Sequence, residues 1–163
     1  MNSREVLNVT LDGSDMVVSM YLNDLTDAEL LVRPVEGINH IAWQLGHLIT
    51  AEHQLMEMAY PGRMPPLPAG FADKYAKETS SIDDPKSFHS KAEYLKLYSQ
   101  QRAGTKAILE KVSDGDLDKP APEAIKEFCA TIGALFALQA SHWLMHAGQW
   151  AVTRRKLGRP PLF

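Results

Sequence analysis

Histidine spacing is the feature of this sequence with the clearest chemical consequence. Of the six histidines, His142 and His146 lie four residues apart in a strongly helical segment. Residues at this spacing leave the same face of a helix, one turn apart, so the two imidazoles can converge on one point. Two ring nitrogens placed in this way can bind one metal ion at roughly 2.0–2.1 Å each. The pair therefore predicts two ligands of a metal site that needs a third ligand from another element.

The best candidate for the third ligand is His47. It lies midway along another predicted helix, in an apolar segment between Gly46 and Leu48. A neutral imidazole on an apolar face is costly unless a partner takes its lone pair, and a metal ion does so. The residues alone leave two alternatives open, which are a core hydrogen bond for His47 and a metal-free packing of the three histidines.

The remaining histidines receive plainer interpretations. His40 lies two turns before His47, which is too far to share one ion, and we interpret it as a surface or helix-cap residue. His53 points away from the His47 face and His89 lies near a helix start. Neither is expected to bind the metal.

Three further side chains are candidates for supporting roles near the site. Gln139 and Gln149 flank the C-terminal histidine pair, each at a spacing of three residues. Either glutamine could hydrogen-bond a ligand imidazole or a bound water. Trp43, one turn before His47, is expected to form a wall of the pocket or simply to pack in the core.

Several common chemistries are excluded because their motifs are missing. The sequence contains no HExxH, Glu-x-x-His, GxxxxGK[ST], GxGxxG or GxSxG. This excludes the zinc-protease helix, bundle di-iron sites, nucleotide-binding loops and the serine-hydrolase elbow. Cys129 is the single cysteine, which rules out an internal disulfide or a CxxC site and fits a reducing cytosol. We expect it to pack as a small apolar residue.

Composition and charge limit the remaining function classes. The 163 residues suffice for one domain with a hydrophobic core, expected to span residues 1–163. A net charge of −3 argues against nucleic-acid binding. The first residues lack the apolar core of a signal peptide, and no segment approaches roughly 18 consecutive apolar residues. We therefore expect a soluble, cytoplasmic protein with no membrane partner.

Apolar periodicity and helix-capping patterns predict an all-α fold. Helices are expected at 14–24, 26–34, 40–59, 90–112 and 131–157. Asn39 is the expected N-cap of the helix at 40–59. Residues 61–89 are rich in proline and are expected to form a long loop with one helical turn at 71–75. No segment alternates apolar and polar residues as a strand would.

The segments that carry the predicted ligands resemble a known family. Residues 38–47, INHIAWQLGH, resemble the "aW-x-x-g-H" signature of helix two in the DinB/YfiT-like superfamily. Residues 142–149, HWLMHAGQ, look like that family's "H-x-x-x-H-x-G-Q" helix, and the tail at 157–162 is similar to its usual ending. The resemblance covers most of the chain from about residue 22 onward, apart from the 60–90 loop.

This resemblance implies a fold and a site. The fold would be a four-helix bundle of up-down-down-up topology, with a long crossover loop between the second and third main helices. His47, His142 and His146 would bind one divalent metal ion, with nickel or zinc foremost and iron or manganese as alternatives. Many members carry an acidic residue directly after the first histidine of the pair, where this chain has Trp143. Any support that such an acid gives to a metal-bound water must be supplied otherwise here.

The expected function follows from an ion with an open position. Three neutral imidazoles leave the ion its full charge and at least one exchangeable position, which is the pattern of catalytic sites. The resemblance implies a metal-dependent enzyme that activates a small thiol, such as bacillithiol or mycothiol, for S-transfer, or that activates a metal-bound water. The alternative is a non-catalytic, stress-related binding protein in which the metal only braces the bundle. A closed structural site needs a fourth ligand, and Glu52 lies well round the helix from His47.

The expected partners are small molecules. A thiol cosubstrate and an electrophile would enter beside the long loop, where Arg63, Lys74 or Tyr75 would contact the substrate. Some members of the family pair through helices, and exposed Met and Leu side chains would allow a homodimer here.

Overall fold

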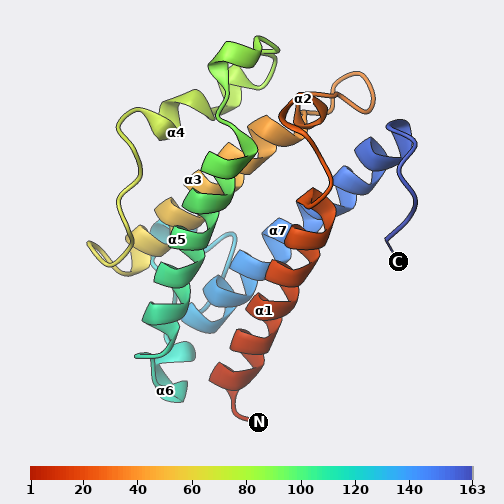
Figure 1. Ribbon diagram of the computed structural model, residues 1–163. Helices are drawn as coiled ribbons and strands as arrows, with labels where there is room; N and C mark the ends of the chain where they lie inside the picture. Colours follow the sequence, from red (N-terminus) through yellow and green to blue (C-terminus); the bar gives the residue numbers. More distant parts are fainter. Residues whose placement is uncertain (163) are drawn as a thin grey trace.

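The computed structural model of the chain describes residues 1–162 and consists of helices and their connections. Four long helices dominate it, namely α1 (Ser3–Leu22), α3 (Ile41–Ala59), α5 (Lys91–Leu109) and α7 (Ile132–Lys156) (Figure 1). Short helical elements connect them, namely α2 (Asp27–Leu30), α4 (Phe71–Lys74), η1 (Lys77–Thr79), η2 (Pro85–Ser87), α6 (Asp114–Leu117) and η3 (Glu123–Ile125). Within residues 1–162 no strand forms, and Pro120 and Thr131 make an isolated β-bridge. The predicted all-α class is confirmed for this part of the chain.

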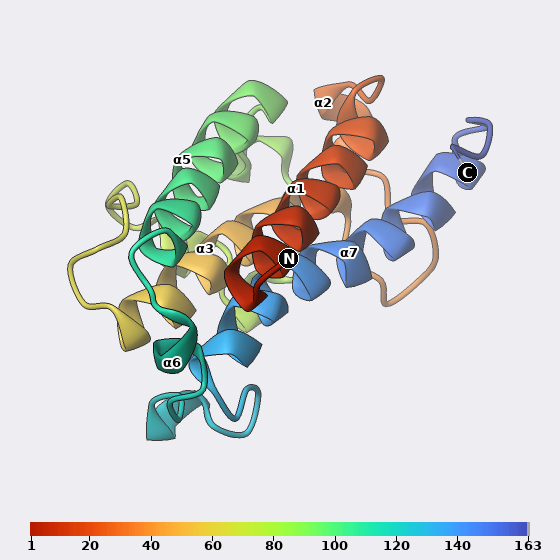
Figure 2. The same ribbon diagram turned by 90° about the horizontal axis from the view of Figure 1, so that it is seen from below.

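The long helices pack side by side in two directions. Helices α1 and α7 run one way, and α3 and α5 run the other way (Figure 1, Figure 2). Lys91, at the start of α5, donates hydrogen bonds to the carbonyls of Leu22, the last residue of α1, and of Leu25, which follows that helix. Gln44, near the start of α3, accepts a hydrogen bond from Trp150 near the end of α7. These contacts hold α5 against α1, and α3 against α7, in antiparallel pairs.

Apolar side chains fill the bundle in two clusters. One cluster includes Trp143 and Trp150 from the C-terminal half of α7, and the other includes Leu135 and Phe136 from its N-terminal half. Among the helices of residues 1–162, none combines the length and the apolar character needed to cross a bilayer.

Capping boxes begin several helices where the sequence predicts them. Thr26 with Glu29, and Ser90 with Glu93, exchange side-chain and backbone hydrogen bonds at helix N-termini. Thr131 caps α7, as expected. These starts depend on short-range hydrogen bonds, which is why the sequence alone predicts them.

The predicted start of the first helix is wrong. Helix α1 begins at Ser3 rather than at residue 14, because Asn2 and Glu5 form a capping box ahead of it. The apolar pattern of its first turns is obscured by Val6 and Val9, which are 46% and 60% exposed. The early turns are therefore helical without showing a clean buried face in the sequence.

The N-cap of α3 is His40, not the predicted Asn39. The Nδ1 atom of His40 accepts a hydrogen bond of 3.0 Å from the backbone N–H of Trp43. Its Nε2 atom lies 3.1 Å from the carbonyl oxygen of Ile82. Both ring nitrogens are thus used, and burial lowers the pKa of this imidazole. The cap-region interpretation of His40 holds, while a surface position is wrong because the residue is fully buried.

The connection at 60–90 is anchored on α3. A Cβ atom at Gly46 would lie 2.2 Å from the ring of Tyr75, so this ring occupies the space that a side chain would need. The Tyr75 hydroxyl lies 2.5 Å from Nδ1 of His89 and 2.7 Å from the hydroxyl of Tyr94. The predicted turn at 71–75 is present as α4, which brings Tyr75 into this position.

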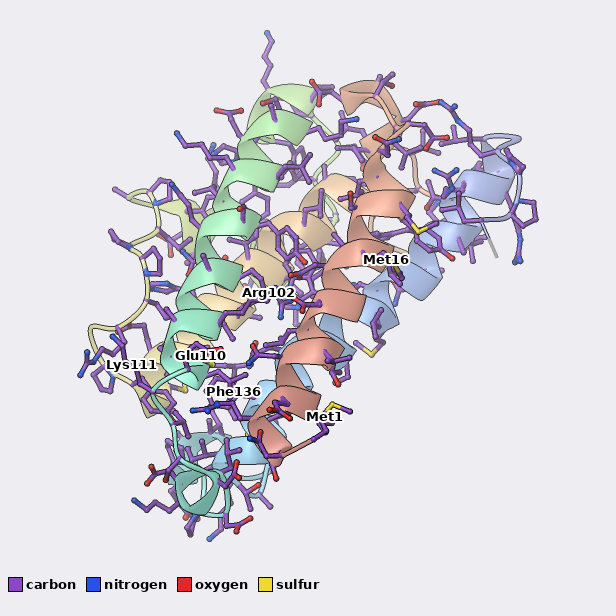
Figure 3. The ribbon with its side chains drawn as sticks, turned by 60° about the horizontal axis from the view of Figure 1, so that its bottom comes forward. Met1, Met16, Arg102, Glu110, Lys111 and Phe136 are labelled. Atoms are coloured by element: carbon purple, nitrogen blue, oxygen red, sulfur yellow. The ribbon has the colours of Figure 1, made fainter. Side chains whose placement is uncertain are left out.

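A buried ion-pair network joins all four long helices. Glu52 of α3 and Arg102 of α5 are 1% and 3% exposed, and their charged groups lie 3.4 Å apart. Arg102 also pairs at 3.1 Å with Asp15 of α1, and Figure 3 shows its side chain between α5 and α1. Glu52 accepts hydrogen bonds from Thr105 at 2.7 Å and from the indole N–H of Trp143 on α7 at 2.9 Å.

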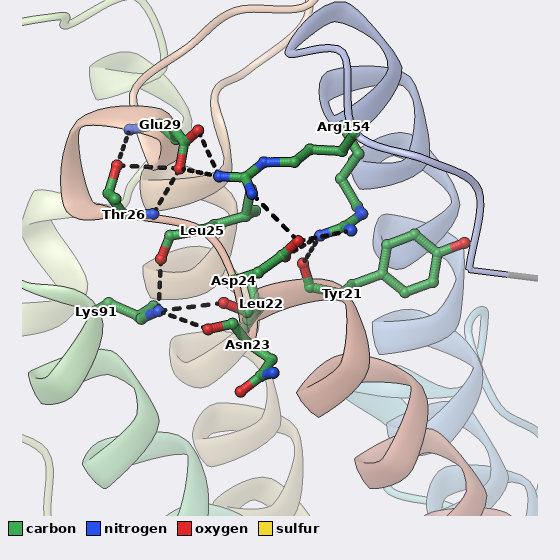
Figure 4. Close-up of polar contacts among 10 residues, drawn as sticks. Tyr21, Leu22, Asn23, Asp24, Leu25, Thr26, Glu29, Lys91 and Arg154 are labelled. Atoms are coloured by element: carbon green, nitrogen blue, oxygen red, sulfur yellow. Dashed lines mark hydrogen bonds and ion pairs between the residues drawn. The ribbon is translucent and has the colours of Figure 1, made fainter.

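The end of α7 is tied to the turn that follows α1. Arg154 pairs with Asp24 and donates a hydrogen bond of 3.1 Å to the carbonyl of Tyr21 (Figure 4). Arg159 pairs with Glu29 at 2.8 Å. These contacts hold the C-terminal half of α7, and with it the segment that carries the histidine pair, against the rest of the bundle.

Removing the carboxylate of Glu52 should destabilise the bundle strongly. Glu52→Ala leaves Arg102 buried without its partner on α3, which should cost about 3–5 kcal/mol in the free energy of unfolding. Urea unfolding followed by circular dichroism measures the loss. The control Glu123→Ala breaks an exposed pair with Lys126 and should cost less than about 1 kcal/mol. Equal losses in the two variants would contradict a stabilising role for the network.

A methyl group at Gly46 should dislodge the loop. In Gly46→Ala the new Cβ atom collides with the Tyr75 ring, which should cost about 1–3 kcal/mol and speed proteolysis within 60–90. The control is Gly148→Ala on α7, where no atom lies within 4 Å of the added Cβ. Helix propensity should make that variant more stable by up to about 1 kcal/mol. Thermal unfolding and limited proteolysis report both effects, and an unchanged cleavage rate in Gly46→Ala would refute the anchoring.

Candidate metal centre

The three predicted ligands meet where α3 packs against α7. His47 projects from α3, and His142 and His146 project from successive turns of α7. One nitrogen from each ring lies within 4.8 Å of the nitrogens chosen from the other two. The ring centroids of His47 lie 5.6 Å and 5.8 Å from those of His142 and His146, which are 5.1 Å apart. Separations of this size suit three nitrogens that share one ion at about 2.1 Å each.

The three imidazoles are neutral at ordinary pH. Burial lowers the pKa of His47, and it lowers the pKa values of His142 and His146 to about 4. Part of this lowering in His142 and His146 comes from the neighbouring imidazoles, because a positive charge on one ring disfavours a second. Neutral rings keep the lone pairs that a metal ion requires.

Gln44 sets the orientation of one ligand ring. Its Oε1 atom lies 2.9 Å from Nδ1 of His146 and accepts a second hydrogen bond, also of 2.9 Å, from the indole N–H of Trp150. Its Nε2 atom donates to the carbonyl of Asn39 at 2.6 Å, which leaves Oε1 as the acceptor. Nδ1 of His146 therefore carries the proton, and its Nε2 atom keeps the lone pair for a metal.

Gln44 was not among the residues predicted for the site, although its spacing in the sequence gives a signal for it. Gln44 precedes His47 by three residues, the same spacing that singled out the glutamines on α7. It bonds to a histidine of the other helix because α3 and α7 run antiparallel and bring its amide opposite His146. The three-residue spacing from a histidine therefore indicates a supporting amide on α3 as well as on α7.

The expected hydrogen bonds from Gln139 and Gln149 to the imidazoles are not formed. Gln139 is buried, and its amide donates to the carbonyl of Leu135 one turn earlier on the same helix. Gln149 is half-buried and makes no hydrogen bond to a histidine within residues 1–162. The amide that hydrogen-bonds an imidazole of the site is instead that of Gln44, which lies on α3.

Trp43 lies directly against a ligand ring. Its indole stacks on the imidazole of His47 with centroids 5.0 Å apart and planes only 7° from parallel. The indole N–H donates a hydrogen bond of 3.0 Å to the hydroxyl of Thr79 in the long connection. Trp43 is also 95% buried within the core, so the two roles considered for it, pocket wall and core residue, coexist.

Trp143, at the position where the resemblance implies an acidic residue in many family members, packs in the core against the rings of Tyr98 and Trp150. Its indole N–H donates to Glu52 inside the ion-pair network. The Glu52 carboxylate is also used by Thr105 and Arg102, so it is not a fourth ligand. Within residues 1–162, no Asp or Glu joins the three histidines in the group that could hold an ion.

The donor set fits a divalent transition metal. In the described part of the chain, the group of side chains with suitable spacing comprises His47, His142 and His146, with no Cys, Asp or Glu among them. His47 and His142 are half-buried and make no hydrogen bond with other residues of 1–162. Their unused ring nitrogens and partial exposure suit an ion that solvent can reach. Three imidazole nitrogens are ligands for zinc, nickel and iron.

The other polar candidates lie away from the three histidines. His53 hydrogen-bonds Gln101 at 3.1 Å, and His89 bonds Tyr75. Cys129 is buried and free, and its thiol donates weakly to the carbonyl of Ile125. These positions agree with the plain interpretations given to the three residues.

The loop residues expected to contact a substrate have different surroundings. The Tyr75 hydroxyl is already used by His89 and Tyr94, and its ring is 98% buried. Lys74 is exposed. Arg63 lies just after α3 and lines a separate cavity near the end of that helix. The long connection therefore packs against α3 through Tyr75, and the cavity that Arg63 lines contains none of the three histidines.

Comparison with known proteins assigns the chain to a family. Searches of curated proteins and of solved structures gave no match. The family model described as the DinB superfamily matches residues 10–150, which is most of the chain and includes all three histidines of the site. With its helical fold and its histidine cluster, the chain belongs to the DinB superfamily.

Proposed function

We propose that the chain is a metal-dependent enzyme whose single divalent ion is held by His47, His142 and His146. One observation carries the proposal, which is the convergence of three neutral imidazoles without a carboxylate or thiol among them. Structural zinc sites are normally closed by four protein ligands, whereas catalytic sites keep a position open. A site of three ligands, two of them partly exposed, matches the second pattern.

The proposed reaction is S-transfer, in which a small thiol attacks an electrophile. When bound, nickel or zinc, or alternatively iron or manganese, would act as a Lewis acid that lowers the pKa of the thiol or of a water. A hydrolytic reaction is the variant in which water takes the place of the thiol. Both fit the absence of a nucleophilic cysteine or serine motif in the sequence.

The residues of the chain would act by holding the ligands. Gln44 keeps the proton of His146 on Nδ1, so that Nε2 faces the centre. Trp43 stacks on His47 and restricts rotation of that ring. Because these contacts already restrict the two imidazoles, less conformational entropy is lost when an ion binds, and this favours binding.

The competing function is a non-catalytic protein in which the ion braces the bundle. The contacts between α3 and α7 argue against a need for such a brace. Gln44 with Trp150, and Glu52 with Trp143, already join the two helices by buried hydrogen bonds. The bundle is therefore held together at this contact without help from a metal.

The arrangement of the long helices agrees with the fold implied by the family. We propose that the four long helices form the up-down-down-up bundle implied by the family, with the 60–90 segment as its crossover. The directions of the helices in Figure 1 are consistent with this arrangement. It places α3 and α7 antiparallel, which brings one histidine and a histidine pair to the same level.

Metal content tests the ligand set. Protein produced without a nickel column should contain about one divalent ion per chain by elemental analysis, because three neutral nitrogens form one site. Replacing His47, His142 or His146 by alanine should remove most of that metal. His53→Ala, a matched control on α3, should retain it, because His53 bonds Gln101 instead. Equal metal content in His47→Ala and His53→Ala would refute the site.

Activity separates the enzyme from the brace. The loaded protein should accelerate conjugation of a small thiol to 1-chloro-2,4-dinitrobenzene for at least one of bacillithiol, mycothiol and glutathione, and His142→Ala should abolish the acceleration. A protein that binds metal, melts at a lower temperature after chelation and is inactive with every thiol and in ester hydrolysis would instead support the brace.

Gln44 should affect metal affinity without being a ligand. Gln44→Leu removes the acceptor for His146 and should weaken metal binding roughly 10–100-fold, the usual effect of losing a partner of a ligand imidazole. Gln149→Leu is the matched control and should leave the affinity unchanged. Competition with a chelating dye measures both variants, and an unaltered affinity in Gln44→Leu would show that this contact does not support the ligand.

A further inference from the structure

A cavity of about 640 Å³ lies at the end of the bundle opposite the C-terminus of α7. Its walls come from the ends of α3 and α5, the start of α7 and the segment 116–122. Tyr60, which lines it, follows His47 by 13 residues, or about 20 Å along a helix. None of the three histidines lines it. Its volume lies within the range of roughly 300–1,000 Å³ that is typical of small-molecule pockets.

The rim of this cavity carries excess positive charge. Three cations, Arg63, Lys111 and Lys119, line it against one carboxylate, Asp116, which leaves a balance of two positive charges. Asp116 is already engaged, because it pairs with Lys119 at 2.5 Å and accepts a hydrogen bond from Ser113.

The two remaining cations have no counter-ion within residues 1–162. The side chains of Arg63 and Lys111 make no hydrogen bond or ion pair with other residues of 1–162. Glu110, next to Lys111 in sequence, is turned toward α1, where it accepts a hydrogen bond of 3.1 Å from Asn8. Glu57, the acidic residue nearest to Arg63 in sequence, accepts hydrogen bonds of 2.7 Å from the backbone N–H groups of Gly62 and Met64. Figure 3 shows Glu110 and Lys111 at the end of α5. Arg63 and Lys111 are therefore available to an anion.

The inner surface of the cavity is largely apolar. Ile108, Val112, Ala121 and Ile132 line it and belong to the hydrophobic cluster at this end of the bundle. The half-buried Tyr60 supplies a hydroxyl that has no hydrogen-bond partner within the described residues. Apolar walls, one free hydroxyl and a cationic rim are together complementary to a ligand with an apolar body and an anionic head.

We propose that this cavity binds a small amphipathic carboxylate, with the apolar body against Ile108 and Val112 and the carboxylate between Arg63 and Lys111. The Tyr60 hydroxyl would donate a hydrogen bond to the ligand. This site is independent of the metal centre and does not depend on the proposed function. A neutral ligand of the same shape loses the two charge-assisted contacts, and a cationic one is repelled by the rim.

Calorimetric titration with decanoate tests the proposal. The full-length protein should bind decanoate saturably at one site, at least tenfold more tightly than decanol, and should not bind decyltrimethylammonium there. The double variant Arg63→Ala/Lys111→Ala should lower the affinity for decanoate roughly tenfold or more, because charge-assisted hydrogen bonds are lost. Lys96→Ala, which removes an exposed lysine elsewhere on α5, should leave the affinity unchanged.

A blocking variant locates the site. Ala107 is exposed and lines the cavity, so Ala107→Trp should fill its mouth and abolish decanoate binding while the protein keeps its helical circular dichroism. His47→Ala should bind decanoate as the natural protein does, which separates this result from the fate of the metal centre. The proposal is overturned if decanol binds as tightly as decanoate, or if Ala107→Trp, although folded, binds decanoate normally.

Discussion

The antiparallel contact between α3 and α7 is the constraint on which the candidate site depends. Two buried bridges hold it. Gln44 of α3 joins Trp150 and His146, and further along α3, Glu52 joins Trp143. His47 lies between Gln44 and Glu52 in sequence, so the bridges bracket the level at which the imidazoles meet. Shifting either helix by one residue would rotate its side chains by about 100°, which would break both bridges and separate the histidines. The packing of Trp143 and Trp150, whose indole N–H groups bind α3, therefore brings the three histidines together without a bound ion.

Adjacent residues of α7 lie in two different electrostatic environments. His142 faces the neutral cluster, where burial lowers its pKa to about 4. Trp143, the next residue, faces a carboxylate whose pKa is raised by burial and lowered by Arg102. Because that carboxylate is paired with the Arg102 guanidinium, its negative charge is largely compensated by the adjacent positive charge. The imidazoles can therefore remain neutral although a buried acid lies only a few residues away along α3. The position of Trp143, where the resemblance implies an acidic residue in many family members, is used here for packing and for a bridge between helices.

Local features of this chain were predictable and long-range ones were not. The pair at 142 and 146 follows from helical period, and the starts at Thr26 and Ser90 follow from hydrogen bonds within four residues. His47 was selected by its apolar surroundings and its resemblance to the family. In contrast, the partnership of Glu52 with Arg102 joins elements 50 residues apart, and nothing in the sequence near either residue specifies it. Gln44 was predictable by spacing, but its partner on another helix was not. His40 was placed correctly in the cap region, but its burial was not predicted, because its second ring nitrogen contacts Ile82, which lies far along the chain.

The indole of Trp43 connects two parts of the chain that are distant in sequence. One edge is held by the hydroxyl of Thr79, while its face rests on the ring of His47. A displacement of the segment around Thr79 would tilt the indole, and the imidazole stacked on it would have to follow. The 60–90 segment is thus coupled, through Trp43, to the orientation of the His47 ring. Insertions, deletions or substitutions in that segment could therefore adjust the geometry of the site from a distance while all three histidines stay the same.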